Sequence, residues 1–343
     1  MAITPVIPWS ESAAFPLLTM LTLIPLATMA AILLSRSSSV ALRIGFAGAL
    51  STVLLSFYLL SVFDADRPGI QLAEEIHNLG FTYSVGVDGA NILFIPLTAI
   101  FTLLVLVYTS ITRHATDRLK IACFLGYEGI LIGAFSAMNL MQFWLWCVLE
   151  LIPVVLLTIR AGTGENRRWV VAFLLQHWLS GLLMTLAGFM LLAFGLMGAA
   201  PDAELTFDWL KLKEVSNAHL QYGSLIFFLL FFGFAIRMPI FPFHGWLPVL
   251  AEQGTVASVA IFLVGLKLGV YGAIRFILPL IPEVAEQWSG FVLTLGLISI
   301  VYGALLALMQ INIRRLLAFA VVSHTGMLVI GIFDFNKYGM EGT

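Results

Sequence analysis

Charged residues are scarce in this sequence. Lys and Arg number 17 and Asp and Glu number 19 among 343 residues, so 10% of the chain is charged while 60% is apolar. A soluble domain carries roughly 25% charged residues, and one of this length could not bury so much apolar surface. A water-soluble enzyme is therefore excluded. Apolar runs near the ~20 residues that span a bilayer recur along the chain, and the alternation of a porin-type barrel is missing. The sequence predicts an all-α, multi-span membrane protein.

Cysteines and cofactor motifs are equally sparse. Cys123 and Cys147 both fall in apolar runs and lack the spacing of zinc or iron–sulfur ligands. The sequence has no Walker A run, no dinucleotide-binding fingerprint and no pair of histidines at metal-binding spacing. It also has no basic stripe. We therefore expect no cofactor or metal in this chain and no nucleic-acid partner.

Ten apolar runs predict ten membrane spans, and the seventh is interrupted. Within it, Pro239, Pro242 and Pro248 each remove a backbone donor and clash with the preceding turn. One helix cannot continue through all three, so we expect a broken helix. Such backbone is tolerated at membrane depth only beside protein or a water-filled cavity. The predicted spans cover about residues 14–34, 40–62, 90–111, 120–137, 140–159, 169–198, 222–250, 256–280, 289–310 and 315–333.

Lys and Arg residues in the loops predict the orientation, because cytoplasmic loops carry an excess of them. With the N-terminus outside, ten lie in inner loops and five in outer loops, which supports that orientation. The acidic segments around 64–75 and 202–214 then face outward. The inner residues are Arg36, Arg43, Arg113, Arg118, Lys120, Arg160, Arg167, Arg168, Arg314 and Arg315, and the outer ones are Arg67, Lys211, Lys213, Arg275 and Lys337.

Lys267 is the strongest functional candidate among the few ionisable groups at membrane depth, where a charge costs about 3 kcal/mol or more. It lies in the middle of the eighth predicted span, and Gly265 and Gly269 on either side allow close approach of another helix. A lysine that snorkels to the interface is the alternative, but the central position argues against it. A buried lysine can exchange a proton near neutral pH.

Three further charged residues at membrane depth are candidates. Arg237 stands at the break in the seventh span. It is a poor proton carrier because arginine stays protonated, and it serves either as a fixed charge or as a donor to freed carbonyls. Glu150, in the fifth span, is the natural counter-ion of a buried cation, or one half of a static ion pair. Glu128 is a second acid, placed either at membrane depth or near one end of its span.

Two histidines complete the set. His244 follows Pro242 in the broken helix, and His324 lies in the tenth span. Histidine titrates near neutrality, so each could relay a proton; each could equally satisfy backbone groups by hydrogen bonding. The predicted proton path therefore consists of Lys267, Arg237, Glu150, Glu128, His244 and His324.

Five segments carry a resemblance to a known family. The sequence resembles the antiporter-like membrane subunits of respiratory complex I, the Mrp antiporters and related hydrogenases, and most closely the M-type subunit. Its mitochondrial counterpart is called chain 4, and its counterpart in chloroplasts and cyanobacteria is the D-type subunit. The matching segments are 86–89 (GVDG), 150–153 (ELIP), 237–248 (RMPIFPFHGWLP), 265–275 (GLKLGVYGAIR) and 314–326 (RRLLAFAVVSHTG).

The resemblance implies a fold of roughly fourteen helices with two inverted repeats, each of five helices and each carrying a broken helix. It divides this chain into an N-terminal three-helix segment (1–111), the first repeat with helices 4 to 8 (112–282) and the start of the second repeat (283–343). The broken helix of the second repeat is absent. The last residues, 339–343, follow the tenth span directly without a polar tail, so we expect the natural subunit to be longer.

Two departures from the family pattern stand out. The family places lysine where this chain has Arg237. The family's fifth-helix glutamate stands five residues before the proline, where this chain has Val148, whereas Glu150 stands three before it. Two residues turn a helix by about 200°, so Glu150 points to nearly the opposite side. We therefore expect Arg237 to be a fixed charge whose acid partner is Glu150 or Glu128, with Lys267 exchanging the proton.

The function that the resemblance implies is proton translocation by a membrane subunit of a complex-I-like quinone oxidoreductase. Quinone, iron–sulfur clusters and the electron donor would belong to other subunits, and the partners would be other membrane subunits and lipids. Residues 250–258 are most similar to cyanobacterial variants, including those of the CO2-uptake form with its CO2-hydrating module. The location would be a cyanobacterial thylakoid or a bacterial plasma membrane. The alternatives are an Mrp-type cation/proton antiporter subunit and a non-conducting spacer.

Overall fold

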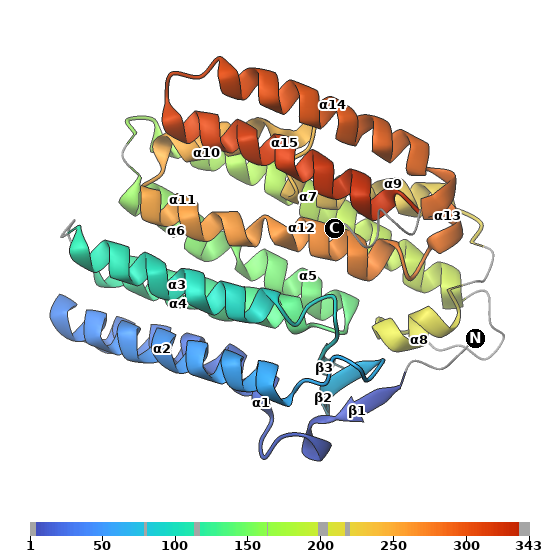
Figure 1. The fold of residues 1–343 in the computed structure, drawn as a ribbon, viewed down its shortest axis with the longest axis horizontal. Coiled ribbons are helices and arrows are strands. Elements are labelled where there is room, and N and C mark those ends of the chain that lie inside the picture. The colour runs from blue at the N-terminus through green and yellow to red at the C-terminus, as the bar shows by residue number, and fades with distance from the viewer. Residues whose placement is uncertain are drawn as a thin grey trace. The chain divides into compact units, whose positions relative to one another are not determined.

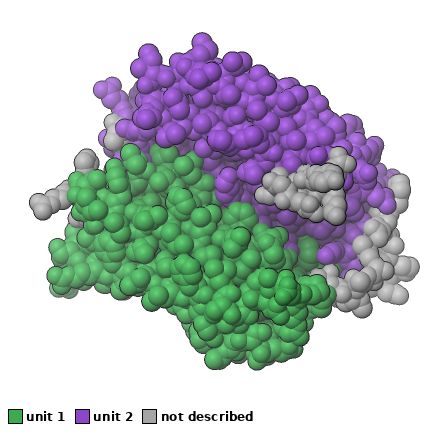
Figure 2. Space-filling view, in the orientation of Figure 1, with its two compact units in different colours: residues 1–161, 208–210, 256–265 green, residues 162–207, 211–255, 266–343 purple. Residues whose placement is uncertain are grey.

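The computed structural model describes residues 5–78, 81–112, 117–162, 164–197, 205–216 and 220–335. The chain forms two compact units, shown in Figure 2: unit 1 comprises residues 1–161, 208–210 and 256–265, and unit 2 comprises residues 162–207, 211–255 and 266–343. These units do not test the three predicted segments, 1–111, 112–282 and 283–343, which stay a prediction.

The predicted spans are largely confirmed. Across the described ranges, nine helical segments are long and apolar enough to cross a membrane, and a tenth apolar helix, α9 (Gly223–Arg237), is shorter. Residues 140–161 and 256–277 each act as one span, although each is divided into shorter helices. The chain is therefore a multi-pass integral membrane protein, with the elements traced in Figure 1. The seventh predicted span is the one that falls short, because its helix ends at Arg237.

Unit 1 is built around helix α4, in which every residue from Ile121 to Ser136 is buried. Helices α1, α2, α3, α5 and α6 all contact it. Glycine makes this possible, since a methyl group on Gly126 would come within 2.5 Å of Met29 Sδ. The helices of unit 1 are α1 (Leu17–Leu34), α2 (Ser38–Val62), α3 (Phe94–Ile111), α4 (Arg118–Ser136), α5 (Leu140–Leu149), α6 (Leu151–Ala161), α11 (Val256–Gly265) and the short 3-10 helix η1 (Trp9–Glu11).

A three-stranded sheet in unit 1 corrects the all-α prediction. Strand β2 (Ile70–Asn78) lies between β1 (Val6–Pro8), which runs parallel to it, and β3 (Phe81–Val87), which runs antiparallel. Leu72, Val85 and Val87 turn into an apolar core with the first residues of α1. These strands are shorter than a membrane span and polar on one side, so no long apolar run marks them in the sequence.

Glu74 of β2 caps the N-terminus of α1. Its carboxylate accepts hydrogen bonds from the backbone N–H of Leu18 at 2.7 Å, from that of Thr19 at 3.0 Å and from the Thr19 hydroxyl. The helix has no acceptor of its own there, because its N-cap residue is Pro16. A negative charge at a helix N-terminus is also favoured by the helix dipole. The hairpin therefore supplies the cap that the local sequence of α1 lacks.

Burial raises the pKa of Glu74 above its ordinary value, although the hydrogen bonds from Thr19 and Leu18 oppose the shift. The folded protein therefore holds a proton on Glu74 at a pH where the unfolded chain has lost it. Stability from this group is fully present below the ordinary carboxyl pKa and is lost as the pH rises through the raised one.

Unit 2 contains the broken helix and the C-terminal helix pair. Helix α9 packs against α7, and the short helix α12 packs against α9, while α15 contacts both α14 and α10. A cluster of phenylalanine rings joins α9 to α14 and α15 through Phe228, Phe231, Phe291 and Phe333. The remaining elements are α7 (Arg167–Met197), α8 (Trp209–Glu214), η2 (Phe243–Gly245), α10 (Trp246–Gln253), α12 (Lys267–Gly272), the π-helical η3 (Ala273–Ile277), α13 (Pro282–Gln287), α14 (Ser289–Leu308) and α15 (Ile313–Phe333).

The predicted orientation stays a prediction, but one of the basic residues counted for it does not lie in a loop. The charge count places Arg275 in an outer loop, and this is wrong. It lies in η3, within the span that ends at Ile277, and it is buried, with its Nε donating to the Tyr271 hydroxyl at 3.1 Å. Arg113, Lys337 and residues 202–204 of the acidic segment lie outside the described residues.

Replacing Glu74 with alanine should destabilise the protein by about 1–2 kcal/mol, because the first N–H groups of α1 lose their acceptor. Thermal unfolding in mild detergent would measure this. The matched control is Glu75→Ala, since Glu75 is the next residue on the strand and is exposed; its effect should stay within about 0.5 kcal/mol. The wild-type protein should also lose stability as the pH rises above the ordinary carboxyl range, and the Glu74→Ala protein should lack that slope. Equal effects of both variants would contradict the capping role.

Candidate functional site

The break in the seventh span is confirmed. Helix α9 ends at Arg237, residues 238–242 are not helical, and the chain resumes in η2 and α10. Pro239 and Pro242 lie in the break, as predicted. Pro248 does not interrupt the helix, which corrects the prediction: it is the third residue of α10, where the backbone N–H has no intrahelical acceptor to lose.

Side chains supply hydrogen bonds that the broken helix cannot. The indole N–H of Trp246 donates to the carbonyl oxygen of Ile236 at 2.8 Å, and the backbone N–H of Phe241 donates to the hydroxyl of Ser299 at 2.9 Å. An unpaired backbone group in a membrane costs several kcal/mol. These two contacts therefore hold the non-helical segment in place within unit 2.

Arg237 is 5% exposed and stands at the last turn of α9. Its guanidinium carbon lies 4.5 Å from the ring centroid of Trp178 on α7. The Trp178 ring meets Trp246 edge to face at 5.1 Å. A desolvated cation over a tryptophan face is stabilised by about 2 kcal/mol. The Trp178 ring thus provides a contact for the Arg237 cation, whose role as a fixed charge stays a prediction. The two tryptophans are residues that sequence reasoning missed, because a tryptophan in an apolar run carries no distinguishing signal.

His244 lies in η2 and is 7% exposed. Rings of Phe241, Tyr302 and Phe319 surround it at centroid distances of 6.2, 5.2 and 6.1 Å. Its Nδ1 has no hydrogen-bond partner among the residues that the structure describes. The ring nitrogen is therefore available to an added partner. A hydrated path along His244 stays a prediction.

Lys267 is the first residue of α12 and is half-buried. A methyl group on Gly269 would come within 2.5 Å of Met238 N and 2.8 Å of the Phe234 carbonyl oxygen. The predicted close approach at Gly269 is thus confirmed. The missing side chain lets the helix that begins at Lys267 contact the end of α9 beside Arg237.

In unit 1, Glu150 sits where α5 meets α6 and is fully buried. The hydroxyl of Tyr127 on α4, itself fully buried, donates to Glu150 Oε1 at 2.7 Å. A methyl group on Gly265 would overlap the Tyr127 hydroxyl and come within 2.6 Å of Glu150 Oε1. The glycine therefore leaves room for this pair. Tyr127 is another functional candidate that the sequence did not reveal.

The other predicted acid and histidine differ in their surroundings. Glu128 is fully buried at the middle of α4, and neither carboxyl oxygen has a hydrogen-bond partner within the described ranges. Its alternative placement near one end of a span is thereby excluded. His324 is exposed on α15. Val148, at the family's usual acid position, is half-buried, whereas Glu150 is fully buried. Arg237 belongs to unit 2 and both acids to unit 1, so their predicted pairing stays a prediction.

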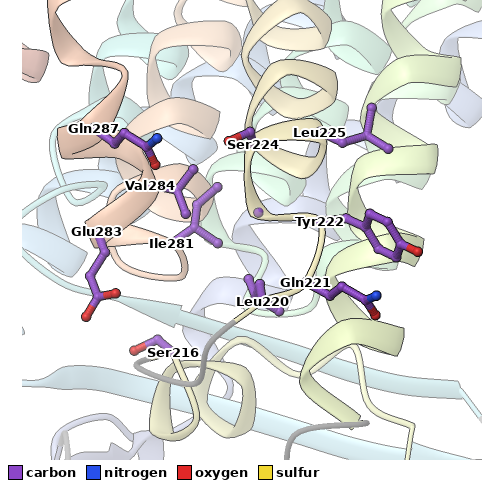
Figure 3. Close-up of a pocket in the computed structure, with 11 residues that line it drawn as sticks. Ser216, Leu220, Gln221, Tyr222, Ser224, Leu225, Ile281, Glu283, Val284 and Gln287 are labelled. Carbon is purple, nitrogen blue, oxygen red and sulfur yellow. The ribbon is translucent and has the colours of Figure 1, made fainter.

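A pocket of about 480 Å³ opens in unit 2, away from the predicted residues (Figure 3). It lies between the start of α9 and α13, and Glu283 and Gln287 of α13 form one side. None of the six predicted proton-path residues lines it. The lining residues are Ser216, Leu220, Gln221, Tyr222, Gly223, Ser224, Leu225, Ile281, Glu283, Val284 and Gln287.

Comparison with known proteins places this chain in a family. The model of the transmembrane part of the NADH:quinone oxidoreductase/Mrp antiporter family matches residues 137–343. NADH-quinone oxidoreductase subunit M of Rickettsia conorii is 31% identical over 338 residues, covering 95% of this chain and 67% of that protein. The chain thus spans about two thirds of that relative. It belongs to the NADH:quinone oxidoreductase/Mrp antiporter family.

Solved structures agree with this assignment. A chain of respiratory complex I from Thermus thermophilus superposes with a TM-score of 0.81 at 28% identity, covering 95% of this chain and 66% of that one. A chain of the Mrp complex from Dietzia sp. gives a TM-score of 0.80 at 18% identity, covering 94% and 35%, and shares the fold alone. Within the family, the protein is an antiporter-like subunit of the complex I type.

Replacing Gly269 with alanine should destabilise the protein by about 1–3 kcal/mol, because the added methyl group must push α12 away from the backbone of Phe234 and Met238. The matched control is Gly290→Ala at the start of α14, where a methyl group meets nothing within 4 Å. Thermal unfolding of the two variants in detergent measures the difference. A Gly269→Ala protein as stable as the control would show that the close contact is not required.

Proposed function

We propose that this chain is a proton-translocating membrane subunit of a complex-I-type quinone oxidoreductase. The observation that carries the proposal is the break after Arg237, with the helix of Lys267 packed against it at Gly269. A broken helix with buried charge beside it is the kind of ion site that inverted-repeat transporters use. Family membership and the likeness to a complex I chain support the same function.

In the proposed mechanism, three residues of the path have distinct roles. Arg237, held over Trp178, is a fixed positive charge that does not give up a proton. Lys267 takes up and releases the proton. Glu150 is an acid whose charge state depends on the hydrogen bond from Tyr127.

The other members of the path are Glu128, His244 and His324. This chain transfers no electrons in the mechanism. Electron transfer in partner subunits, which would hold the quinone and the iron–sulfur clusters, changes the charge on the path and drives proton movement.

Replacing Lys267 with alanine should leave the complex assembled and strongly reduce proton uptake driven by an electron donor, because the carrying amine is gone. The measurement is donor-driven acidification of vesicles that contain the intact complex, with assembly checked by native electrophoresis. Lys120→Ala is the control, since Lys120 lies near the start of α4. Normal proton uptake by an assembled Lys267→Ala complex would rule out this role.

Arg237→Lys should keep proton uptake, because a cation remains beside Trp178, whereas Arg237→Ala should abolish it. Losing one member of a buried charge pair costs about 3–5 kcal/mol, so removal of the true acid partner should do similar damage. Glu150→Gln and Glu128→Gln, assayed beside Arg237→Ala, would identify that partner. If the Arg237→Ala complex takes up protons normally, the arginine serves only as a donor to the carbonyl groups freed at the end of α9.

An Mrp-type cation/proton antiporter subunit is the second candidate, favoured by the fold shared with the Mrp chain. Cation-driven proton exchange in vesicles without any electron donor would support the antiporter and argue against the first candidate. The third reading, a non-conducting spacer, would leave the half-buried Lys267 unused.

A finer version of the proposal assigns the chain to a cyanobacterial form of the complex that serves CO2 uptake, with its N-terminus on the lumenal side of the thylakoid membrane. Only the similarity of residues 250–258 supports the CO2-uptake assignment, whereas the Lys and Arg count supports the orientation. Purification of the chain in mild detergent, followed by mass spectrometry of its partners, tests it. Recovery of a CO2-hydrating module would support the finer version, and recovery of quinone-complex subunits without one would contradict it.

A further inference from the structure

Glu128 has an environment unlike that of any other predicted residue. It is fully buried, and within the described part of the chain neither of its carboxyl oxygens accepts or donates a hydrogen bond. A buried polar group without a partner costs free energy, and an ionised one costs far more. Glu150, only 22 positions along the chain, has the Tyr127 hydroxyl instead. The two acids are therefore not equivalent.

The position of Glu128 on α4 shows which helices it faces. Ile121, seven residues before it, is the side chain that a methyl group on Gly45 of α2 would meet at 2.8 Å. Phe135, seven residues after it, stacks on Phe94 of α3 with ring centroids 4.8 Å apart. Residues seven apart in a helix lie on one face. Glu128 thus lies on the face of α4 that is turned towards α2 and α3.

The same contacts fix what stands level with Glu128. Helix α2 runs in the same direction as α4, so Thr52, seven residues after Gly45, is at the height of Glu128. Helix α3 runs in the opposite direction, so Thr102, eight residues after Phe94, is at that height as well. Both threonines are fully buried. Two buried hydroxyl groups therefore stand at the level of the acid, on the two helices that its face is turned towards.

These hydroxyl groups are already committed as donors. Thr52 donates to the carbonyl oxygen of Gly48 at 3.0 Å, and Thr102 donates to that of Thr98 at 3.0 Å. Their remaining lone pairs can only accept. A carboxylate needs donors and finds none in these groups, whereas a carboxylic acid has an O–H to give them. These two hydroxyl groups thus offer no donor that would stabilise an ionised Glu128.

Basic residues do not change this conclusion. Helices α1, α3 and α5 contain no Lys or Arg. On α2 the basic residue is Arg43, and on α6 it is Arg160, and both are exposed. On α4 itself, Arg118 and Lys120 are ten and eight residues away, which is about 15 and about 12 Å of helix rise. No cation in the helices packed on α4 is placed to neutralise Glu128.

We propose that Glu128 is a resident proton-binding site of unit 1, separate from the Tyr127–Glu150 pair, that holds its proton at rest and gives it up only when an acceptor reaches its buried carboxyl group. This inference rests on the proposed function for its physiological role. The protonated state of the side chain is independent of that function.

An apolar carbodiimide tests the resting state, because it reacts with protonated carboxyl groups that are reached from lipid. The carboxyl oxygen adds to the central carbon of the reagent and the acid proton moves to its nitrogen, so one molecule of reagent is added and nothing leaves. Peptide mass spectrometry of the labelled, intact complex should find the adduct on Glu128. A water-soluble carbodiimide with an added amine should instead modify the exposed Glu75 and leave Glu128 unlabelled.

Variants separate the site from a structural role. Glu128→Gln should lose the label and keep the melting temperature, because the amide is neutral and close in shape to the protonated acid, while donor-driven proton uptake falls several-fold. Glu128→Leu removes a buried polar group that has no partner among the described residues, so it should also lose the label and should not lower the melting temperature. Should Glu128→Gln fail to assemble, labelling of the wild-type complex decides.

Two results would overturn the proposal: absence of apolar label on wild-type Glu128, or normal proton uptake by an assembled, unlabelled Glu128→Gln complex. Failure of the proposed function has a different signature, since then the wild-type complex shows no donor-driven uptake while Glu128 is still labelled.

Discussion

A membrane interior offers no water to a polar group, so every donor, acceptor and charge within the spans depends on a partner from the protein. Three local arrangements answer this demand. Trp246 and Ser299 take up backbone groups freed by the break after Arg237. The Trp178 ring receives the arginine cation. Tyr127 donates to Glu150. In each case an aromatic or hydroxyl side chain replaces water, and that is why the polar residues persist in an otherwise apolar chain.

Glycine decides how near the helices come to these polar groups. Gly265 leaves space for the Tyr127–Glu150 hydrogen bond in unit 1, and Gly269 lets the helix of Lys267 touch the end of α9 in unit 2. The two glycines are four residues apart with the lysine midway between them. Close helix packing through small residues is the usual means of association in membranes, where lipid is as apolar as the side chains. Here the same device positions the ionisable groups.

Much of the fold and part of the site could be predicted from the sequence. The features that could not be predicted have physical reasons for being hidden. The spans follow from run length, the break from Pro239 and Pro242, and the role of Gly269 from its spacing to Lys267. The prediction that Pro248 interrupts the helix was wrong, because a proline in the first turn of a helix breaks no hydrogen bond. Arg275 stands near the end of its predicted span and was counted with the outer loop, but the folded chain buries it beside the Tyr271 hydroxyl.

The aromatic partners Tyr127 and Trp178 were invisible, since rings in apolar runs pack far more often than they bind charge. The burial of Glu128 depends on the three-dimensional surroundings of α4, which one sequence does not show. The sheet at residues 70–87 was missed because its strands match neither the length nor the apolarity of a span.

The bond from Glu74 to α1 has a consequence for how the chain enters the membrane. During synthesis, α1 emerges more than fifty residues before its cap, so its first N–H groups wait without an acceptor until β2 arrives. The cap forms only if β2 reaches the side on which α1 begins, and that requires α1 and α2 to cross as a pair. Strand β1, parallel to β2, must lie there too. The hydrogen bonds of the Glu74 carboxylate therefore form only after α1 and α2 have been inserted as a pair in the correct orientation.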